Sequence, residues 1–188
     1  ASRNVTFLDN HDMSRFLSVV GEDIKKFKSG LAMLLTIRGI PQIYYGTEIL
    51  MKNFSNPDGL VRADFPGGWT NDKVNKFTAA GRDAKENDAF NYLKTLANYR
   101  KQTTALQTGK LMQYVPQEGV YVYFRYDKTK TVMIIVNSND KVSAIKTNRF
   151  NERLNGFNKA KNIFDGSEVI LKGTLEIPAT TTLILELR

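Results

Sequence analysis

The chain has 188 residues, of which 41% are hydrophobic, and a formal net charge of +8. This length favours two compact units, because single domains cluster at about 100 to 150 residues. The sequence has no apolar run of about eighteen residues, no lipidation signal and no signal-peptide pattern at its start, so a soluble chain is expected. With no cysteine, disulfides and thiolate metal sites are excluded, and the cellular compartment stays open.

The positive charge raises the question of nucleic-acid binding. Residues 1–105 contain 15 basic and 11 acidic residues (15 − 11 = +4), and residues 106–188 contain 12 and 8 (12 − 8 = +4). The excess is therefore spread over the chain. Phosphate-binding surfaces gather their cations into a patch or stripe, so no nucleic-acid partner is predicted.

The first 50 residues predict a strand, a helix and a second strand. The short β-rich runs are "NVTFLDN" and "PQIYYG". Between them, Glu22 and Asp23 suit the start of a helix, and Gly39 followed by Pro41 suits its end. The apolar residues of this helix recur at three- and four-residue steps: Ile24, Phe27, Leu31, Leu34 and Leu35.

A helical crossover of this length joins parallel strands, and parallel sheets bind ligands beyond the carboxyl ends of their strands. Asn10, His11 and Asp12 follow the first predicted strand, and residues 45–48 follow the second. The sequence therefore predicts a polar site at this edge of the sheet.

Residues 52–83 are rich in Asn, Asp, Gly and Pro and predict a long loop, which in a compact domain is usually functional. An amphipathic helix is predicted from Asp88 to about Leu106, with Asn87 or Asp88 as its N-cap.

After Gln107 the pattern changes to short strands. Val120, Val122, Phe124 and Tyr126 alternate, and the runs "TVMIIVN", "VSAIK", "EVILK", "TLEI" and "TLILELR" follow, separated by turn residues. This spacing predicts an antiparallel β-sandwich. The fold class is thus α/β followed by all-β, with residues 1–106 and 107–188 as the two domains. Two parallel strands cannot close a barrel or cover both faces of a sheet, so we expect further strands upstream.

Three segments resemble the α-amylase family of retaining glycoside hydrolases. The run from Phe7 to Asp12 resembles a Phe-x-x-Asn-His-Asp signature at the end of barrel strand seven, and "GIPQIYYGTE" resembles strand eight. "NPDGLVRADFPGGW" resembles the loop that follows strand eight in cyclomaltodextrinase and neopullulanase relatives. The segments occur in the family's order and are followed by a helix and a sandwich like the family's C-terminal domain.

The resemblance implies the last two βα units of an incomplete (β/α)8 TIM barrel plus a C-terminal sandwich. The intact enzyme would hydrolyse α-1,4-glucosidic bonds in maltooligosaccharides, cyclodextrins or pullulan. Retention requires a nucleophilic carboxylate and a carboxylic acid about 5 to 5.5 Å apart. The family supplies them after strands four and five, which this sequence does not contain, so the chain alone is expected to be inactive.

The resemblance also assigns roles to individual residues. Asp12 would stabilise the transition state by binding sugar hydroxyls, assisted by His11 and Asn10. Arg62 and Trp69 would contact substrate from the long loop. Three residues are expected to be structural or to support the site: Asp9, Arg15 and Glu48.

Arg15 leaves two readings open, a surface cation at the start of a helix and a partner in a supporting salt bridge. Tyr44 and Tyr45 are expected to pack in the core or at the barrel rim. No metal or other cofactor is predicted for this chain, although some relatives bind calcium through other domains.

The predicted partners are an α-glucan oligosaccharide and the missing N-terminal barrel portion, with no membrane span and the oligomeric state left open. The resemblance implies a periplasmic or secreted enzyme, and a cytoplasmic one is not excluded by the residues. The competing hypothesis is a non-catalytic carbohydrate-binding or interaction module that uses aromatic residues of the sandwich. A degenerate family member that scaffolds partners is disfavoured by the intact Asn-His-Asp run.

Overall fold

The parallel strand pair predicted near the start of the chain is present but short. The computed structural model describes residues 3–188, and in it β1 (Val5–Thr6) pairs in parallel with β2 (Ile40–Pro41). Beyond the pair, only the hydrogen bonds from Ile40 N to Asn4 O (2.9 Å) and from Gln42 N to Thr6 O (2.8 Å) extend the ladder. Both strands are shorter than predicted, and after β2 the chain turns at Tyr44, whose carbonyl accepts from Thr47 N.

The predicted crossover helix is confirmed as α2 (Ile24–Thr36), preceded by the short α1 (Phe16–Val19). Asp23 caps α2 by accepting hydrogen bonds from Lys25 N at 2.8 Å and Lys26 N at 3.1 Å. The apolar face of α2, which includes Phe27 and Leu31, is buried.

The second helix begins earlier than predicted. α3 (Ala84–Gln102) is capped by Asp83, not by Asn87 or Asp88. Asp83 Oδ1 accepts from Glu86 N at 2.8 Å and Glu86 Oε2 accepts from Asp83 N at 3.0 Å, which is a capping box. The helix also ends earlier, since Thr103 is extended and α4 (Thr104–Gln107) is a separate turn.

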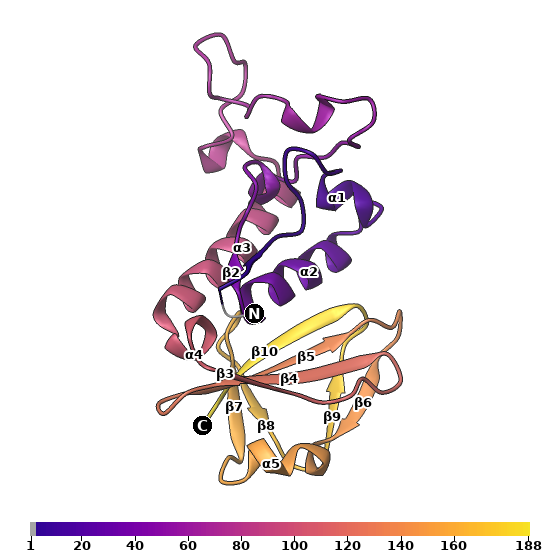
Figure 1. Cartoon of the computed structure of the whole chain (residues 1–188), viewed down its shortest axis with the longest axis vertical. Coiled ribbons are helices and arrows are strands. Elements are labelled where there is room, and N and C mark those ends of the chain that lie inside the picture. The colour runs from indigo at the N-terminus through magenta and orange to yellow at the C-terminus, as the bar shows by residue number, and fades with distance from the viewer. Residues whose placement is uncertain (1–2) are drawn as a thin grey trace.

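The long loop between residues 52 and 83 is confirmed. It contains only the 3-10 turns η2 (Leu60–Arg62) and η3 (Ala79–Gly81), and a third turn, η1 (Thr47–Ile49), precedes it. The rings of Phe65 and Phe77 pack at 4.3 Å, and Asp72 Oδ2 accepts from Gly67 N at 2.6 Å. These contacts lie within the part of the loop that protrudes from the rest of the molecule (Figure 1).

The remainder forms two antiparallel sheets, as predicted (Figure 1). Six strands follow the order β3-β4-β5-β10-β7-β8, and β6 pairs with β9 in a second, two-stranded sheet. Their bounds are β3 Lys110–Gln113, β4 Val120–Tyr126, β5 Thr131–Asn137, β6 Ser143–Lys146, β7 Lys159–Asn162, β8 Glu168–Ile170, β9 Thr174–Ile177 and β10 Thr181–Leu187. Between β6 and β7 lie η4 (Thr147–Phe150) and α5 (Asn151–Leu154).

Two of these strands, β3 and β7, are absent from the sequence prediction. β7 reads "KAKN", a polar segment with low β-propensity. Its conformation is set by its neighbours, because Ala160 pairs with Leu187 of β10 and with Val169 of β8.

The helices pack directly against the larger sheet. One core joins α2 and α3 to β4, β5 and β10, and a second core lies between the two sheets of the sandwich. Arg125 of β4 is fully buried and donates to Thr36 O at 2.8 Å, while Arg100 donates to Leu35 O at 2.9 Å. Both cations thereby satisfy carbonyls at the C-terminal end of α2, where the helix dipole favours positive charge.

No helix within residues 3–188 is long and apolar enough to span a membrane.

Candidate functional site

The segment that follows β1 displays His11 and Asp12 at the surface. Asn10 Oδ1 accepts from Asp12 N at 2.8 Å, and Asn10 O accepts from Met13 N at 3.4 Å. This Asx turn engages the side chain of Asn10 in the local backbone. The side chains of His11 and Asp12 are 65% and 66% exposed.

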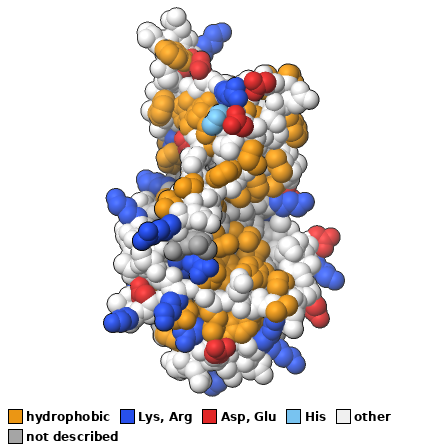
Figure 2. All heavy atoms as spheres, in the orientation of Figure 1, with side chains coloured by type: hydrophobic (Ala, Val, Ile, Leu, Met, Phe, Trp, Pro, Cys, Tyr) orange, Lys and Arg blue, Asp and Glu red, His pale blue; other side chains and the backbone are white. Residues whose placement is uncertain are grey.

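Arg62 connects this segment to the long loop. His11 Nε2 lies 3.2 Å from Asp12 Oδ2, and Arg62 Nη2 lies 3.1 Å from Asp12 Oδ1. Arg62 Nε also donates to the backbone oxygen of His11 at 2.9 Å. In Figure 2 the only histidine, in pale blue, lies among acidic and basic side chains on the surface. Three residues predicted to bind substrate therefore form one exposed cluster.

A residue that the sequence interpretation missed also belongs to this cluster. Asp58 Oδ1 lies 3.3 Å from Arg62 Nη2, so the guanidinium contacts two carboxylates. The four-residue spacing within the same loop was the available signal, since side chains so spaced meet when the backbone turns helically. Here Gly59 and η2 together turn the chain, with Arg62 N donating to Gly59 O at 2.9 Å, and bring Arg62 back to Asp58.

Asp9 lies beneath the cluster and is only 4% exposed. Its Oδ2 accepts from Phe16 N at 2.9 Å, and its Oδ1 accepts from Thr47 Oγ1 at 3.4 Å. Burial raises the pKa of Asp9 above its usual range, although the bond from Phe16 N and the positive charge of Arg15 oppose this. Asp9 thereby fixes the segment after β1 to η1.

Arg15 matches neither of the two interpretations given for it, a surface cation or a salt-bridge partner, although it is a structural residue. It is 1% exposed, so it is not a surface cation, and no carboxylate within residues 3–188 forms an ion pair with it. Its guanidinium carbon lies 4.1 Å from the ring centre of Tyr44 and 4.8 Å from that of Tyr45, and Nη1 donates to Tyr45 O at 2.5 Å. Aromatic faces stabilise the buried cation here, so Tyr44 and Tyr45 have packing contacts.

Within residues 3–188, neither Glu48 nor Trp69 forms a hydrogen bond or ion pair with the cluster. Glu48 is half-buried in the first turn of η1. Trp69 is 65% exposed, and its backbone N donates to Asp72 Oδ2 at 3.1 Å. Within residues 3–188, no hydrogen bond or ring contact joins the Trp69 side chain to Asp12. The same residues contain no group of three or more His, Cys, Asp or Glu side chains that could hold a metal ion.

Two family models match the chain, one over its α/β part and the other over its β-sandwich. Residues 1–85 match the alpha amylase catalytic domain, and residues 111–186 match the cyclo-malto-dextrinase C-terminal domain. Among curated relatives, a cyclomaltodextrin glucanotransferase from Niallia circulans is 32% identical over 94% of this chain and 23% of its own length. An alpha-amylase from the same organism is 36% identical over 72% of this chain and 22% of its own length.

Solved structures agree with these matches. The alpha-amylase from Geobacillus thermoleovorans, solved with acarbose, superposes with a TM-score of 0.77 and 25% identity over 100% of this chain and 39% of that chain. An Anoxybacillus alpha-amylase superposes with a TM-score of 0.78 and 23% identity over 99% of this chain and 38% of that chain. This chain spans about a quarter of the curated relatives' length and under two fifths of the second structure. The chain therefore belongs to the α-amylase family and carries a part of its catalytic domain followed by the family's cyclo-maltodextrinase type of C-terminal domain.

Proposed function

We propose that residues 1–106 form strands seven and eight of a (β/α)8 barrel with their helices and that residues 107–188 form the C-terminal sandwich domain. The parallel pairing of β1 with β2 supports this assignment. So does the exposure of apolar side chains along the pair: Val5 and Ile40 are each 52% exposed, and Phe7 is 42% exposed. Apolar surface is visible in this region of Figure 2 and would be covered by the remaining strands of the barrel.

The intact enzyme is proposed to be a retaining glycoside hydrolase that cleaves α-1,4-glucosidic bonds in maltooligosaccharides, cyclodextrins or pullulan. Names of the relatives, a cyclomaltodextrin glucanotransferase and an alpha-amylase, support an α-glucan substrate. We further propose a periplasmic or secreted location, and no cofactor for the residues of this chain.

The main support for this proposed function is the orientation of the Asp12 carboxylate. Arg62 holds Oδ1 and His11 holds Oδ2, at 3.1 and 3.2 Å. A carboxylate oxygen has two acceptor sites, so each retains one for a neighbouring sugar hydroxyl. Hydrogen bonds of this kind that strengthen as the ring distorts would stabilise the transition state, and losing one costs on the order of a hundredfold in rate.

The other residues have supporting roles in this proposal. His11 orients Asp12 through Nε2 and offers its second ring nitrogen, Nδ1, to the same sugar. Asn10 shapes the turn that presents Asp12, and Trp69 offers an exposed indole for a pyranose face. Asp9 and Arg15 fix the segment after β1 through their hydrogen bonds, and Glu48 has a structural role in η1.

The chain alone should not turn over substrate, because the proposed nucleophile and acid are not among its residues. Two measurements test this. The first incubates the chain with a chromogenic maltoside, and genuine turnover would overturn the assignment of residues. The second follows the imidazole signals of His11, the only histidine in the chain, by NMR during titration with maltoheptaose.

We expect a saturable shift of these signals in the natural chain and its loss in Asp12→Asn. The matched control is Asp140→Asn, which changes an exposed acid in the sandwich. If maltoheptaose leaves the His11 signals unchanged in the natural chain, this cluster does not bind glucan.

The competing hypothesis, a carbohydrate-binding module based on sandwich aromatics, has weaker support. Tyr123 and Phe150 are fully buried and cannot stack on a sugar. Tyr114 packs against both Phe124 and Phe150, and Arg153 lies over the ring of Tyr126. Tyr121 is partly exposed, and its hydroxyl donates to Gln113 at 2.7 Å.

A further inference from the structure

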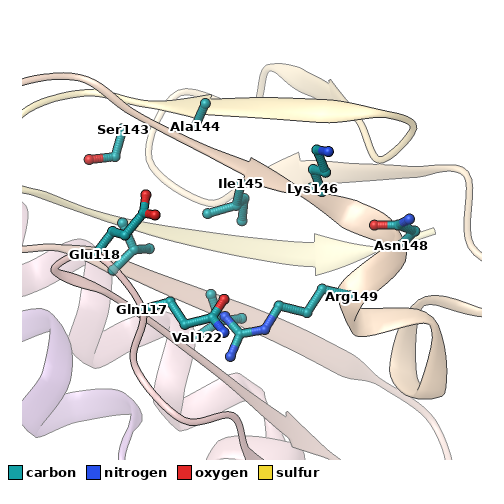
Figure 3. A pocket seen from close by; sticks show the side chains of 10 residues that line it. Gln117, Glu118, Val122, Ser143, Ala144, Ile145, Lys146, Asn148 and Arg149 are labelled. Carbon is teal, nitrogen blue, oxygen red and sulfur yellow. The ribbon is translucent and has the colours of Figure 1, made fainter.

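A groove of about 360 Å³ opens on the side of the sandwich, remote in sequence from the Asp12 cluster (Figure 3). One wall is β6, whose four residues Ser143 to Lys146 all line the groove. Alternate residues of a strand point to opposite faces. A cavity lined by every residue of β6 therefore faces the edge of that strand and not one of its faces.

The hydrogen-bond register shows which backbone groups of β6 point into the groove. Thr147 N donates to Gly173 O at 2.9 Å, so this pair is a hydrogen-bonded pair of the β6–β9 ladder. Such pairs alternate along an antiparallel ladder. Ser143 and Ile145 therefore bond to β9, whereas the N–H and C=O groups of Ala144 and Lys146 point outward. β6 has no second neighbouring strand within residues 3–188.

The opposite wall includes a hydrogen-bonded turn. Glu118 and Gly119 form a two-residue turn with φ values of 49° and 75°, closed by Val120 N donating to Gln117 O at 2.8 Å. Asn139 Nδ2 donates to Glu118 O at 2.7 Å and fixes the turn from behind.

Charge and hydrophobicity are arranged along the groove. Figure 3 shows Glu118 near the Ser143 end and Lys146 near the other end, with the side chain of Arg149 reaching back along the groove toward Gln117. None of the three charged residues forms an ion pair within the described part of the chain, and Arg149 Nη2 already donates to Val115 O at 2.6 Å. Val120, Val122 and Ile145 provide apolar side chains that line the groove.

We propose that this groove binds an extended peptide segment of another protein, which adds to β6 as an antiparallel strand. Its backbone would pair with the outward groups of Ala144 and Lys146. Residues opposite Ala144 and Lys146 would point to the outer face, where an acidic side chain meets Lys146. The residue opposite Ile145 would point inward over Val120 and Val122. The preferred segment therefore alternates acidic and apolar residues.

The experiment uses the full chain and a fluorescein-labelled hexapeptide in which glutamate alternates with valine, followed by fluorescence polarisation. We expect saturable binding that weakens when lysine replaces glutamate and disappears when the glutamates are N-methylated, because their N–H groups would face β6. Equal binding of the glutamate and lysine peptides would overturn the proposal.

Two variants locate the site. Ala144→Pro removes an outward N–H that the β6–β9 ladder does not use, so the fold should persist while binding weakens about tenfold. Lys146→Glu should reverse the preference between the two peptides, and this test does not depend on the folding of Ala144→Pro. Unchanged preference in Lys146→Glu would contradict the proposal.

Two further outcomes would assign the groove to a different ligand and overturn the proposal. Displacement of the peptide by maltoheptaose would indicate a glucan. A concentration-dependent dimer in sedimentation, lost in Ala144→Pro, would indicate that a second copy of this chain covers β6.

Discussion

Arg62 Nη2 lies 3.1 Å from Asp12 Oδ1, although fifty positions separate the two residues in the sequence. The same guanidinium donates from Nε to the backbone oxygen of His11. One loop side chain thereby sets both the orientation of a carboxylate and the position of the turn that carries it.

Replacing Arg62 by alanine should weaken maltoheptaose binding to the chain about tenfold, because a charge-assisted bond that orients Asp12 is lost. The free energy of unfolding should change by less than about 1 kcal/mol, since the arginine is partly exposed. Calorimetric titration and urea unfolding measure the two effects. Asp58→Asn is the control, because it removes only the second carboxylate partner, and an equal loss of affinity there would contradict a specific role for the Asp12 contact.

Replacing Arg125 by methionine should destabilise the chain by about 2 to 4 kcal/mol, because the buried carbonyl of Thr36 loses its donor. Urea unfolding followed by circular dichroism would measure this. Arg38→Met provides the comparison, since Arg38 is exposed and its loss should cost less than about 0.5 kcal/mol. Similar costs for both variants would refute the role of Arg125 at the end of α2.

Asp83→Ala should cost about 1 kcal/mol of stability, since it removes the capping box of α3. Asp88→Ala tests the N-cap predicted from the sequence. It removes only a surface pair with Lys28 at 2.7 Å, so the cost should stay below that of Asp83→Ala. If Asp88→Ala lowered the thermal stability more than Asp83→Ala, the result would support the N-cap predicted from the sequence.

Asp127 should contribute to acid unfolding. Hydrogen bonds from the Thr104 hydroxyl and from Thr129 N and Lys130 N lower the pKa of Asp127 below its usual value of 3.8. The folded state therefore binds this proton less readily than the unfolded state. Its stabilising contribution is present above pH 3.8 and is lost as the pH falls through the folded-state pKa.

Asp127→Asn should flatten the dependence of the unfolding free energy on pH in that acidic range. Asp140→Asn, in another exposed turn, serves as the control. Identical slopes for Asp127→Asn and the natural chain would show that the hydrogen bonds do not persist in solution.

The local pattern of the sequence determined much of the fold. Asp23 and the apolar spacing from Ile24 to Leu35 predict α2 without tertiary information, because capping and amphipathic burial act within a few turns. Alternation from Val120 to Tyr126 predicts β4 in the same way. The run from Asn10 to Asp12 and its family resemblance also predict the polar cluster that follows β1.

Tertiary structure alone decided the rest. β7 is a strand because β8 and β10 hydrogen-bond to it, although its residues favour other conformations. Arg15 is buried because two tyrosine rings enclose it, and Arg62 meets Asp12 because η2 folds back over the segment after β1. Each of these outcomes depends on contacts between residues far apart in the chain, whose energies exceed the weak local preferences that a sequence pattern records.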